Sequence, residues 1–260
     1  MAHSIKISAI IPTCDRPQYL PEAIASICAQ SLQPIEIIVA NNGKEPIPEG
    51  SLGADVQVLN LAPYVGASAA RNAGAKAASG EYLAFLDDDD KWDKDFLYHL
   101  HKSMVEKSAD YIIGDVYVFD ENMLPKLVLS FSKFPRGVKE FLYGKNPGLG
   151  GGNFLVKSHA FFAVGGFDEN VSMSEDALLP FEILMAGYTI AGESKACYHA
   201  RKHPGPRVSH GFKKKYMQFY HKAKERMTYK QRFLYILNIN KHLLKVKFKR
   251  IIKARLKKHP

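Results

Sequence analysis

Short apolar runs alternate with stretches of helical period along the first half of the chain, and this alternation constrains the fold more than any other feature. Apolar runs of strand length bounded by turn residues predict strands, and apolar residues three or four positions apart predict helices. Pro12 is expected to close the first strand and Asp15 to cap the helix after it. The expected strands are 5–11, 35–40, 56–61, 82–86 and 111–119, and the expected helices are 17–28, 66–79 and 94–107.

This order predicts an α/β fold, a mostly parallel sheet flanked by helices. Further along, residues 135–147 are weakly patterned, and a glycine cluster at 148–152 leads into a short expected strand, 154–156. A helix at 177–186, ended by Gly187, and two strands at 188–191 and 195–199 complete the predicted fold. Beyond residue 207 the pattern is helical, basic and aromatic to the end of the chain.

The charge of the chain is divided unevenly. Residues 201–260 hold 20 of the 36 Lys and Arg residues but only one of the 26 acids, Glu225, so the first 200 residues are net acidic. Leu244, Phe248, Ile251 and Ile252 fall at helical spacing among the basic residues, which predicts an amphipathic basic helix. This helix is expected to bind an anionic membrane surface. Nucleic acid is disfavoured because no nucleic-acid-binding motif is present, and a homo-oligomer contact is the remaining option.

The apolar runs and the cysteines indicate the cellular compartment of the protein. No apolar run reaches the length of a membrane span, and the first residues lack the layout of a signal peptide. Three scattered cysteines without metal-ligand spacing are expected to be reduced and packed. The expected location is therefore cytoplasmic, peripheral on the inner face of the cell membrane.

Four consecutive aspartates, Asp87, Asp88, Asp89 and Asp90, follow the expected strand 82–86. Adjacent carboxylates repel one another, so their place after a buried strand predicts a bound cation. Mg²⁺ and Mn²⁺ prefer carboxylate oxygens and commonly take further ligands from substrate phosphates. The alternative is a solvated acidic turn that caps the helix near Trp92.

Several segments occur together in a recognisable order: IIPT at 10–13 followed by Arg16, IIVANNG at 37–43, GASAARNAG at 66–74 and GEYLAFLDDDD at 80–90. In this order the chain resembles the family 2 glycosyltransferases of bacterial surface-polysaccharide type, over about residues 5–205. The resemblance implies the GT-A fold and an inverting reaction. It divides the chain into a catalytic domain, 1–205, with a nucleotide-binding half of about 1–115 and an acceptor half of about 116–205, and a basic amphipathic helical tail, 206–260.

The resemblance also implies roles for individual residues. Asn41 stands where the family usually has an aspartate that accepts a hydrogen bond from uracil. Its amide oxygen can also accept this bond, so a UDP-sugar is favoured. Thymine presents the same hydrogen-bonding edge, so a dTDP-sugar remains an alternative. The implied metal ion, Mn²⁺ or Mg²⁺, is bound by Asp89, and Asp87, His199 and His203 are further candidate ligands. The implied nucleotide-binding residues are Thr13, Asp15, Arg16, Asn41, Arg71, Asp87 and Asp88.

The acceptor side of the implied site lies in the second half of the chain. Gly151, Gly152, Asn153 and Glu175 are implied to line it, and the segments GGFDE at 165–169 and SED at 174–176 lead to the implied general base, Asp176. This carboxylate would take the proton from an acceptor hydroxyl as it attacks the sugar. The acceptor is expected to be a glycan or a lipid-linked molecule, and the transferred group a hexose or an N-acetylhexosamine.

Two other functions use similar residues. A nucleotidyltransferase on a related fold also has acidic metal ligands, but it typically carries a glycine-rich, lysine-bearing loop where this chain has Thr13-Cys14-Asp15-Arg16. A sugar-nucleotide-binding protein without catalysis is the non-enzyme alternative, and the presence of Asp176 argues against it.

Overall fold

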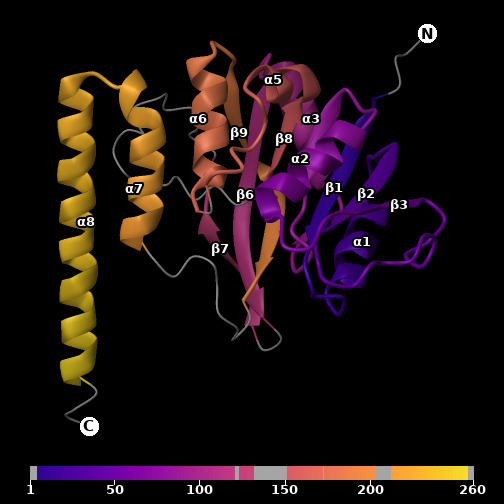
Figure 1. Ribbon diagram of the computed structural model, residues 1–260, viewed down its shortest axis with the longest axis horizontal. Coiled ribbons are helices and arrows are strands. Elements are labelled where there is room, and N and C mark those ends of the chain that lie inside the picture. The colour runs from indigo at the N-terminus through magenta and orange to yellow at the C-terminus, as the bar shows by residue number, and fades with distance from the viewer. Residues whose placement is uncertain (1–4, 121–122, 132–150, 172, 203–211, 257–260) are drawn as a thin grey trace.

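The computed structural model describes residues 5–120, 123–131, 151–171, 173–202 and 212–256. In these residues nine strands form one sheet, with helices packed against it (Figure 1). The strands are β1 (Ile7–Thr13), β2 (Glu36–Asn41), β3 (Val56–Asn60), β4 (Tyr82–Phe85), β5 (Lys91–Trp92), β6 (Tyr111–Asp120), β7 (Met123–Leu129), β8 (Phe154–Lys157) and β9 (Ile190–Arg201). The helices are α1 (Leu20–Cys28), α2 (Ala67–Ala77), α3 (Phe96–Glu106), α5 (Ser158–Ala163), α6 (Glu175–Met185), α7 (Phe212–Ala223) and α8 (Tyr229–Leu256), with the 3-10 turn η1 (Lys224–Arg226) between the last two.

The predicted α/β fold with a mostly parallel sheet is confirmed. The strands lie in the order β3-β2-β1-β4-β8-β6-β9-β5, and β7 pairs with β6. β1 to β4 are parallel, β8 runs antiparallel between β4 and β6, and β6 is parallel to β9. Six strands therefore run in one direction, and their carboxyl ends meet at one edge of the sheet, where ligands bind in open α/β sheets.

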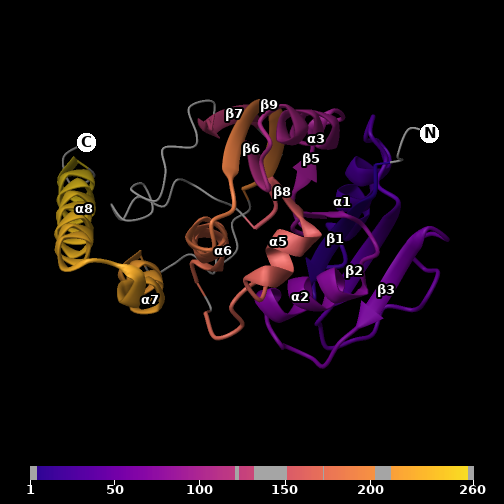
Figure 2. The same cartoon turned by 90° about the horizontal axis from the view of Figure 1, so that it is seen from above.

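Helices cover both faces of this sheet. Figure 2 shows α1 and α3 on one side and α2 and α5 on the other. Gln30, just after α1, accepts a hydrogen bond from Leu97 N (3.0 Å) and donates one to Asp93 O (2.7 Å), which joins α1 to α3. On the opposite face, Asn72 of α2 bonds the backbone of Phe167, in the loop after α5.

The predicted strands and helices of the first half are confirmed, but two details around Pro12 are wrong. β1 continues through Pro12 to Thr13. Ile10 O accepts a hydrogen bond from Leu86 N (2.9 Å), and residues two apart in a strand point their backbone groups to the same side. Pro12 therefore faces β4, which has already ended at this point. Its missing N–H thus removes no hydrogen bond between β1 and β4. Asp15 does not cap α1, because the N-cap residue is Tyr19 and Asp15 instead accepts a hydrogen bond from Lys44 N (2.8 Å).

The two strands predicted at 188–191 and 195–199 are one strand, β9. Its pairing with β6 shifts register between Gly114 and Asp115, so the polar residues that resembled a break are accommodated as a bulge. Gly114 permits this, since a Cβ there would lie 2.6 Å from Ala196 O. The sequence did not predict β5, which has two residues, β7, which contains a proline, or the short helix α5.

The helices α7 and α8 pack against the rest of the protein. The Phe219 ring of α7 lies 5.3 Å from that of Phe181 in α6 and stacks at 5.7 Å on Tyr235 of α8. The Tyr235 hydroxyl donates to Tyr216 O (3.0 Å), and Lys222 pairs with Asp168 (2.6 Å). Part of the basic tail thus shares the main hydrophobic core.

Some predicted features fall outside the described residues: the segment 135–147, His203, and the side chains of Phe248, Ile251 and Ile252. Leu244 is described and is exposed. Across the described parts of the chain, no helix combines the length and apolar character that crossing a membrane requires.

Replacing Phe219 tests whether α7 belongs to the folded core. Phe219→Ala should lower the free energy of unfolding in urea by about 3–5 kcal/mol, since it empties a buried aromatic site. Phe233→Ala is the matched control on α8, because that ring is 67% exposed and its loss should change stability by about 0.5 kcal/mol at most. Equal effects of the two substitutions would show that α7 is not part of the core.

Candidate functional site

The acidic run lies at the carboxyl edge of the sheet, immediately after β4. Leu86 N donates to Ile10 O, and Asp90 N donates to Asp87 O (3.1 Å), which folds the run into a tight turn beside β1. Burial alternates along it: Asp88 and Asp90 are buried, whereas Asp87 and Asp89 are partly exposed. The run therefore presents two carboxylates outward and holds two inward.

Asp88 is held by residues at the end of β1. Thr13 Oγ1 donates to its Oδ2 (2.7 Å), and Arg16 bridges Asp88 and Asp89 with its two terminal nitrogens. Burial raises the pKa of Asp88 to about 6, although the Arg16 charge and the Thr13 hydrogen bond act in the opposite direction. The predicted Thr13 and Arg16 thus contact the acidic run directly.

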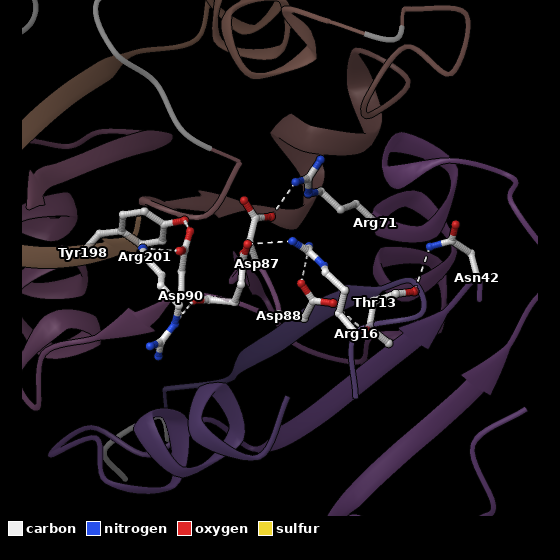
Figure 3. Close-up of polar contacts among 10 residues, drawn as sticks. Thr13, Arg16, Asn42, Arg71, Asp87, Asp88, Asp90, Tyr198 and Arg201 are labelled. Atoms are coloured by element: carbon white, nitrogen blue, oxygen red, sulfur yellow. Dashed lines mark hydrogen bonds and ion pairs between the residues drawn. The ribbon is translucent and has the colours of Figure 1, made fainter. Parts of the chain in front are cut away.

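Asp90 is held from the other side, by β9. The Tyr198 hydroxyl and Arg201 N (2.7 Å) both donate to its carboxylate. Burial raises the pKa of Asp90 well above its ordinary value, and the neighbouring Asp89 and Asp87 add to this. Figure 3 shows Arg71 and Arg16 on one side of the run and Tyr198 and Arg201 on the other.

Arg71 connects the run to helix α6. Its Nη2 donates to Asp87 Oδ1 (2.6 Å), and its Nη1 lies 3.8 Å from Glu175 Oε1. The side chain is buried, and among the described residues neither Nε nor Nη1 has a hydrogen-bond acceptor. Such orphaned donors beside a partly exposed carboxylate are suited to an anionic ligand.

Glycine is required beside Arg71. A Cβ at Gly151 would lie 2.8 Å from Arg71 Cζ and 3.2 Å from Asp87 Oδ1. At Gly152 it would lie 2.9 Å from the Tyr198 ring, and Gly152 O accepts a hydrogen bond from Trp92 Nε1 (3.0 Å). Asn153 donates to Gly114 O (2.9 Å), which fixes this segment to β6.

Glu175 and Asp176 begin α6, directly across from Arg71. Ser174, with φ of 81°, turns the chain into this helix. Asp176 lies close to Tyr111, whose pKa is raised well above its ordinary value by burial and next by the Asp176 charge. The first turn of a helix favours carboxylates, which suits both acids.

Asn72 fixes the loop that leads toward α6. Its side-chain oxygen accepts from Phe167 N (2.9 Å), and its Nδ2 donates to Phe167 O (2.8 Å) and Glu169 Oε1 (2.9 Å). The two consecutive residues Arg71 and Asn72 therefore bind different parts of the site.

Three predicted residues lie apart from the acidic carboxylates. Asn41 is buried and braces its loop: its oxygen accepts from Gly43 N (2.9 Å), and its Nδ2 donates to Glu45 O and Asn60 Oδ1 (both 2.9 Å). Asp15 bonds the same loop at Lys44. His199 Nε2 lies 3.2 Å from Asp93 Oδ1, and its ring packs near Tyr117.

Sequence reasoning missed Tyr198 and Asn72. Tyr198 is 108 positions from its partner Asp90, and no spacing rule predicts such a contact. Within the described residues no group of three or more His, Cys, Asp or Glu side chains is placed to hold a metal ion by itself.

The comparison with known families decides what this site belongs to. Residues 8–164 match the family model described as glycosyl transferase family 2, which is more than half of the chain. The chain belongs to this family. Glycosyltransferase GlyA of Streptococcus pneumoniae is 35% identical over 122 residues, 45% of this chain and 18% of GlyA. The family 2 chain spans half or less of the length of each of the first curated relatives.

Solved structures support the GT-A-like fold. Residues 1–349 of S. aureus TarS in complex with UDP-GlcNAc align with a TM-score of 0.63 and 20% identity, over 80% of this chain and 61% of that one. GalNAc-T7 with UDP, GalNAc and Mn²⁺ aligns with a TM-score of 0.60 and 16% identity, over 78% of this chain and 45% of that one. At these identities the likeness establishes the fold of this family 2 enzyme.

The raised pKa of Asp88 gives a testable dependence on pH. Because the folded protein binds this proton more tightly than the unfolded chain, the ionised carboxylate destabilises the fold, fully above about pH 6 and less as the pH falls toward 4. Asp88→Asn removes this charge. In metal-free buffer, the Tm of the variant minus that of the wild type should therefore be larger at pH 7.5 than at pH 5. A smaller difference at pH 7.5 would contradict the assignment.

Proposed function

We propose that this family 2 glycosyltransferase moves a hexose or N-acetylhexosamine from a nucleotide-diphosphate sugar, with UDP favoured, to a hydroxyl of a glycan or lipid-linked acceptor, with inversion. The observation that carries the proposal is the buried Arg71, which has unused donors between the partly exposed Asp87 and the start of α6. A diphosphate offers the oxygens that such donors require.

The donor is proposed to lie along the carboxyl edge of the sheet. Thr13, Asp15 and Arg16 come from the end of β1, near the ends of β2 and β3, and would face the nucleoside. Arg71, Asp87 and Asp88 would face its ribose and diphosphate. Neighbours in fold were solved with UDP-GlcNAc and UDP, which supports a nucleotide-sugar donor of this kind.

Mn²⁺ or Mg²⁺ is proposed to bind at the outward pair of carboxylates. Asp89 and Asp87 are partly exposed and each pairs with an arginine, Arg16 and Arg71, whereas Asp88 and Asp90 are buried. Two hard oxygen donors suit an ion that takes its other ligands from phosphate and water. When bound, such an ion would neutralise the charge of the departing diphosphate.

Asp176 is proposed as the general base. It lies at the start of α6, one residue from the Glu175 that faces Arg71, and the acceptor hydroxyl would approach from the side opposite the diphosphate. Its carboxylate would accept the hydroxyl proton while the oxygen attacks the anomeric carbon. A single displacement of this kind inverts that carbon. Gly151, Gly152, Asn153 and Glu175 would line the acceptor side.

The nucleotidyltransferase alternative is disfavoured by the loop after β1. There Arg16 is tied to Asp88 and Asp89, and Asp15 to Lys44, where such an enzyme would need a glycine-rich loop around a phosphate.

Substitution of Asp176 tests the proposal. Asp176→Asn should lower Mn²⁺-dependent hydrolysis or transfer of a UDP-sugar by about 100-fold or more, because the base is lost, while UDP still raises the Tm in a thermal-shift assay. Asp95→Asn, at an exposed position before α3, is the matched control and should leave turnover unchanged. A nucleotide-induced shift without turnover of any UDP-, dTDP- or GDP-sugar would favour the binding-only alternative.

We further propose that the basic tail holds the enzyme on the inner face of the cell membrane, where a lipid-linked acceptor for surface polysaccharide such as lipopolysaccharide would lie. α8 exposes Tyr229, Phe233 and Leu244, and the chain from 201 onward is strongly basic. Exposed apolar side chains among lysines favour an anionic lipid surface.

Charge reversal tests this attachment. The intact chain should co-sediment with vesicles that contain phosphatidylglycerol and not with neutral ones, and Lys245→Glu with Lys249→Glu and Lys253→Glu should abolish binding. Lys6→Glu with Lys44→Glu and Lys76→Glu, three exposed positions in the body, should leave it largely intact. Equal losses in both triple variants would contradict a role for the tail.

A further inference from the structure

Tyr64 occupies an unusual place in the loop between β3 and α2. Its side chain is 62% exposed, and its φ of 61° lies in the left-handed region that bulky residues rarely adopt. Such a conformation is disfavoured for a bulky residue, and it persists only where the surrounding structure enforces it. A solvent-facing aromatic ring in a strained conformation is therefore a candidate for ligand contact.

The surroundings do enforce it. Tyr64 N donates to Asn42 O (2.7 Å), which ties the loop to the end of β2. Its hydroxyl interacts with Asp15, and this hydrogen bond is the main cause of the raised pKa of Tyr64. Asp15 is itself left-handed, with φ of 53°, and is packed closely by Gly43, where a Cβ would lie 2.6 Å from its Oδ1. Two residues with left-handed backbone thus lie in the loops that follow β1 and β3.

A short series of hydrogen bonds joins this pair to the acidic run. Asn42 donates to Thr13 O through its backbone and its side chain (both 2.9 Å), and Thr13 donates to Asp88 (2.7 Å). Tyr64 therefore lies at the same edge of the sheet as the carboxylates, beyond β1 and β2. Asn41, which the sequence suggested for the base, is buried and bonded within its own loop, whereas Tyr64 is exposed.

We propose that the Tyr64 ring stacks on the base of the nucleotide donor. The inference rests on the proposed nucleotide-sugar donor and adds a residue that contacts its base. An aromatic side chain stacks on any base, with about 1–3 kcal/mol per base, because every base has a π face. Tyr64 accordingly sets the affinity for the nucleoside, and hydrogen-bonding groups elsewhere set the identity of the base.

Tyr64→Gly separates this role from a structural one, because glycine adopts the left-handed conformation without strain. Its Tm should equal or exceed that of the wild type, whereas the Kd for UDP with Mn²⁺, measured by calorimetry, should rise by about 5- to 150-fold. The Kd for inorganic pyrophosphate with Mn²⁺ should stay the same. Tyr64→Phe should remain within about threefold of the wild type for UDP, since stacking needs only the ring. Tyr98→Ala, at an exposed tyrosine of α3, is the control and should change neither Kd.

The outcomes are distinguishable. Unchanged UDP affinity in Tyr64→Gly, or an equal loss for UDP and pyrophosphate, overturns the stacking role while leaving the proposed function in place. A wild-type chain that binds neither UDP, dTDP nor GDP overturns the proposed function itself.

A second measurement does not depend on affinity. Tyr64→Trp places an indole at the proposed contact, and the one native tryptophan, Trp92, is buried. UDP should quench the added fluorescence and pyrophosphate should not. Absence of UDP quenching at saturating ligand would overturn the stacking geometry.

Discussion

Four adjacent carboxyl groups at the end of a buried strand are the constraint on which the rest of this structure depends. Their mutual repulsion and their burial both favour the neutral form, and the pKa values of Asp88 and Asp90 are raised accordingly. Hydrogen-bond donors from separate elements contact these carboxyl groups: Thr13 at the end of β1, Arg16 after it, Arg71 from α2, and Tyr198 from β9. Because each donor comes from a different segment, the run can form only when the whole carboxyl edge of the sheet is assembled.

The division of the run follows from this arrangement. Alternate residues of the turn face opposite ways, so the inward pair, Asp88 and Asp90, is buried, and the outward pair, Asp87 and Asp89, is partly exposed and bonded to Arg71 and Arg16. Arg71 and Asn72 connect the acidic run to the second half of the chain. Arg71 bonds Asp87 of the run, and Asn72 bonds the loop at Phe167. Consecutive residues of one helix thus set the spacing between the acidic run and the start of α6.

Local pattern predicted what local physics determines. Apolar runs placed β1 to β4, and a helical period placed α1 to α3, within one to three residues of their ends. The acidic run was found from sequence because four charges beside a strand are conspicuous. Tyr198 and Asn72 were not, since their partners are about 100 positions away and no periodicity encodes such contacts. Asp15 was misread as a helix cap because its carboxylate accepts a hydrogen bond from Lys44 N, 29 positions away, and no local pattern predicts that contact.

The docking of α7 has a mechanical consequence. Phe219 of α7 packs against Phe181 of α6, Lys222 of α7 pairs with Asp168 before α6, and Arg226 of η1 pairs with Glu182 of α6. α8 in turn stacks on α7 through Tyr235. In the proposed attachment, a membrane surface that binds α8 would therefore also determine the orientation of the sheet and its distance from the membrane. In the proposed attachment, the edge with the aspartates would lie at a set distance from the membrane, and the proposed acceptor group would have to reach that distance.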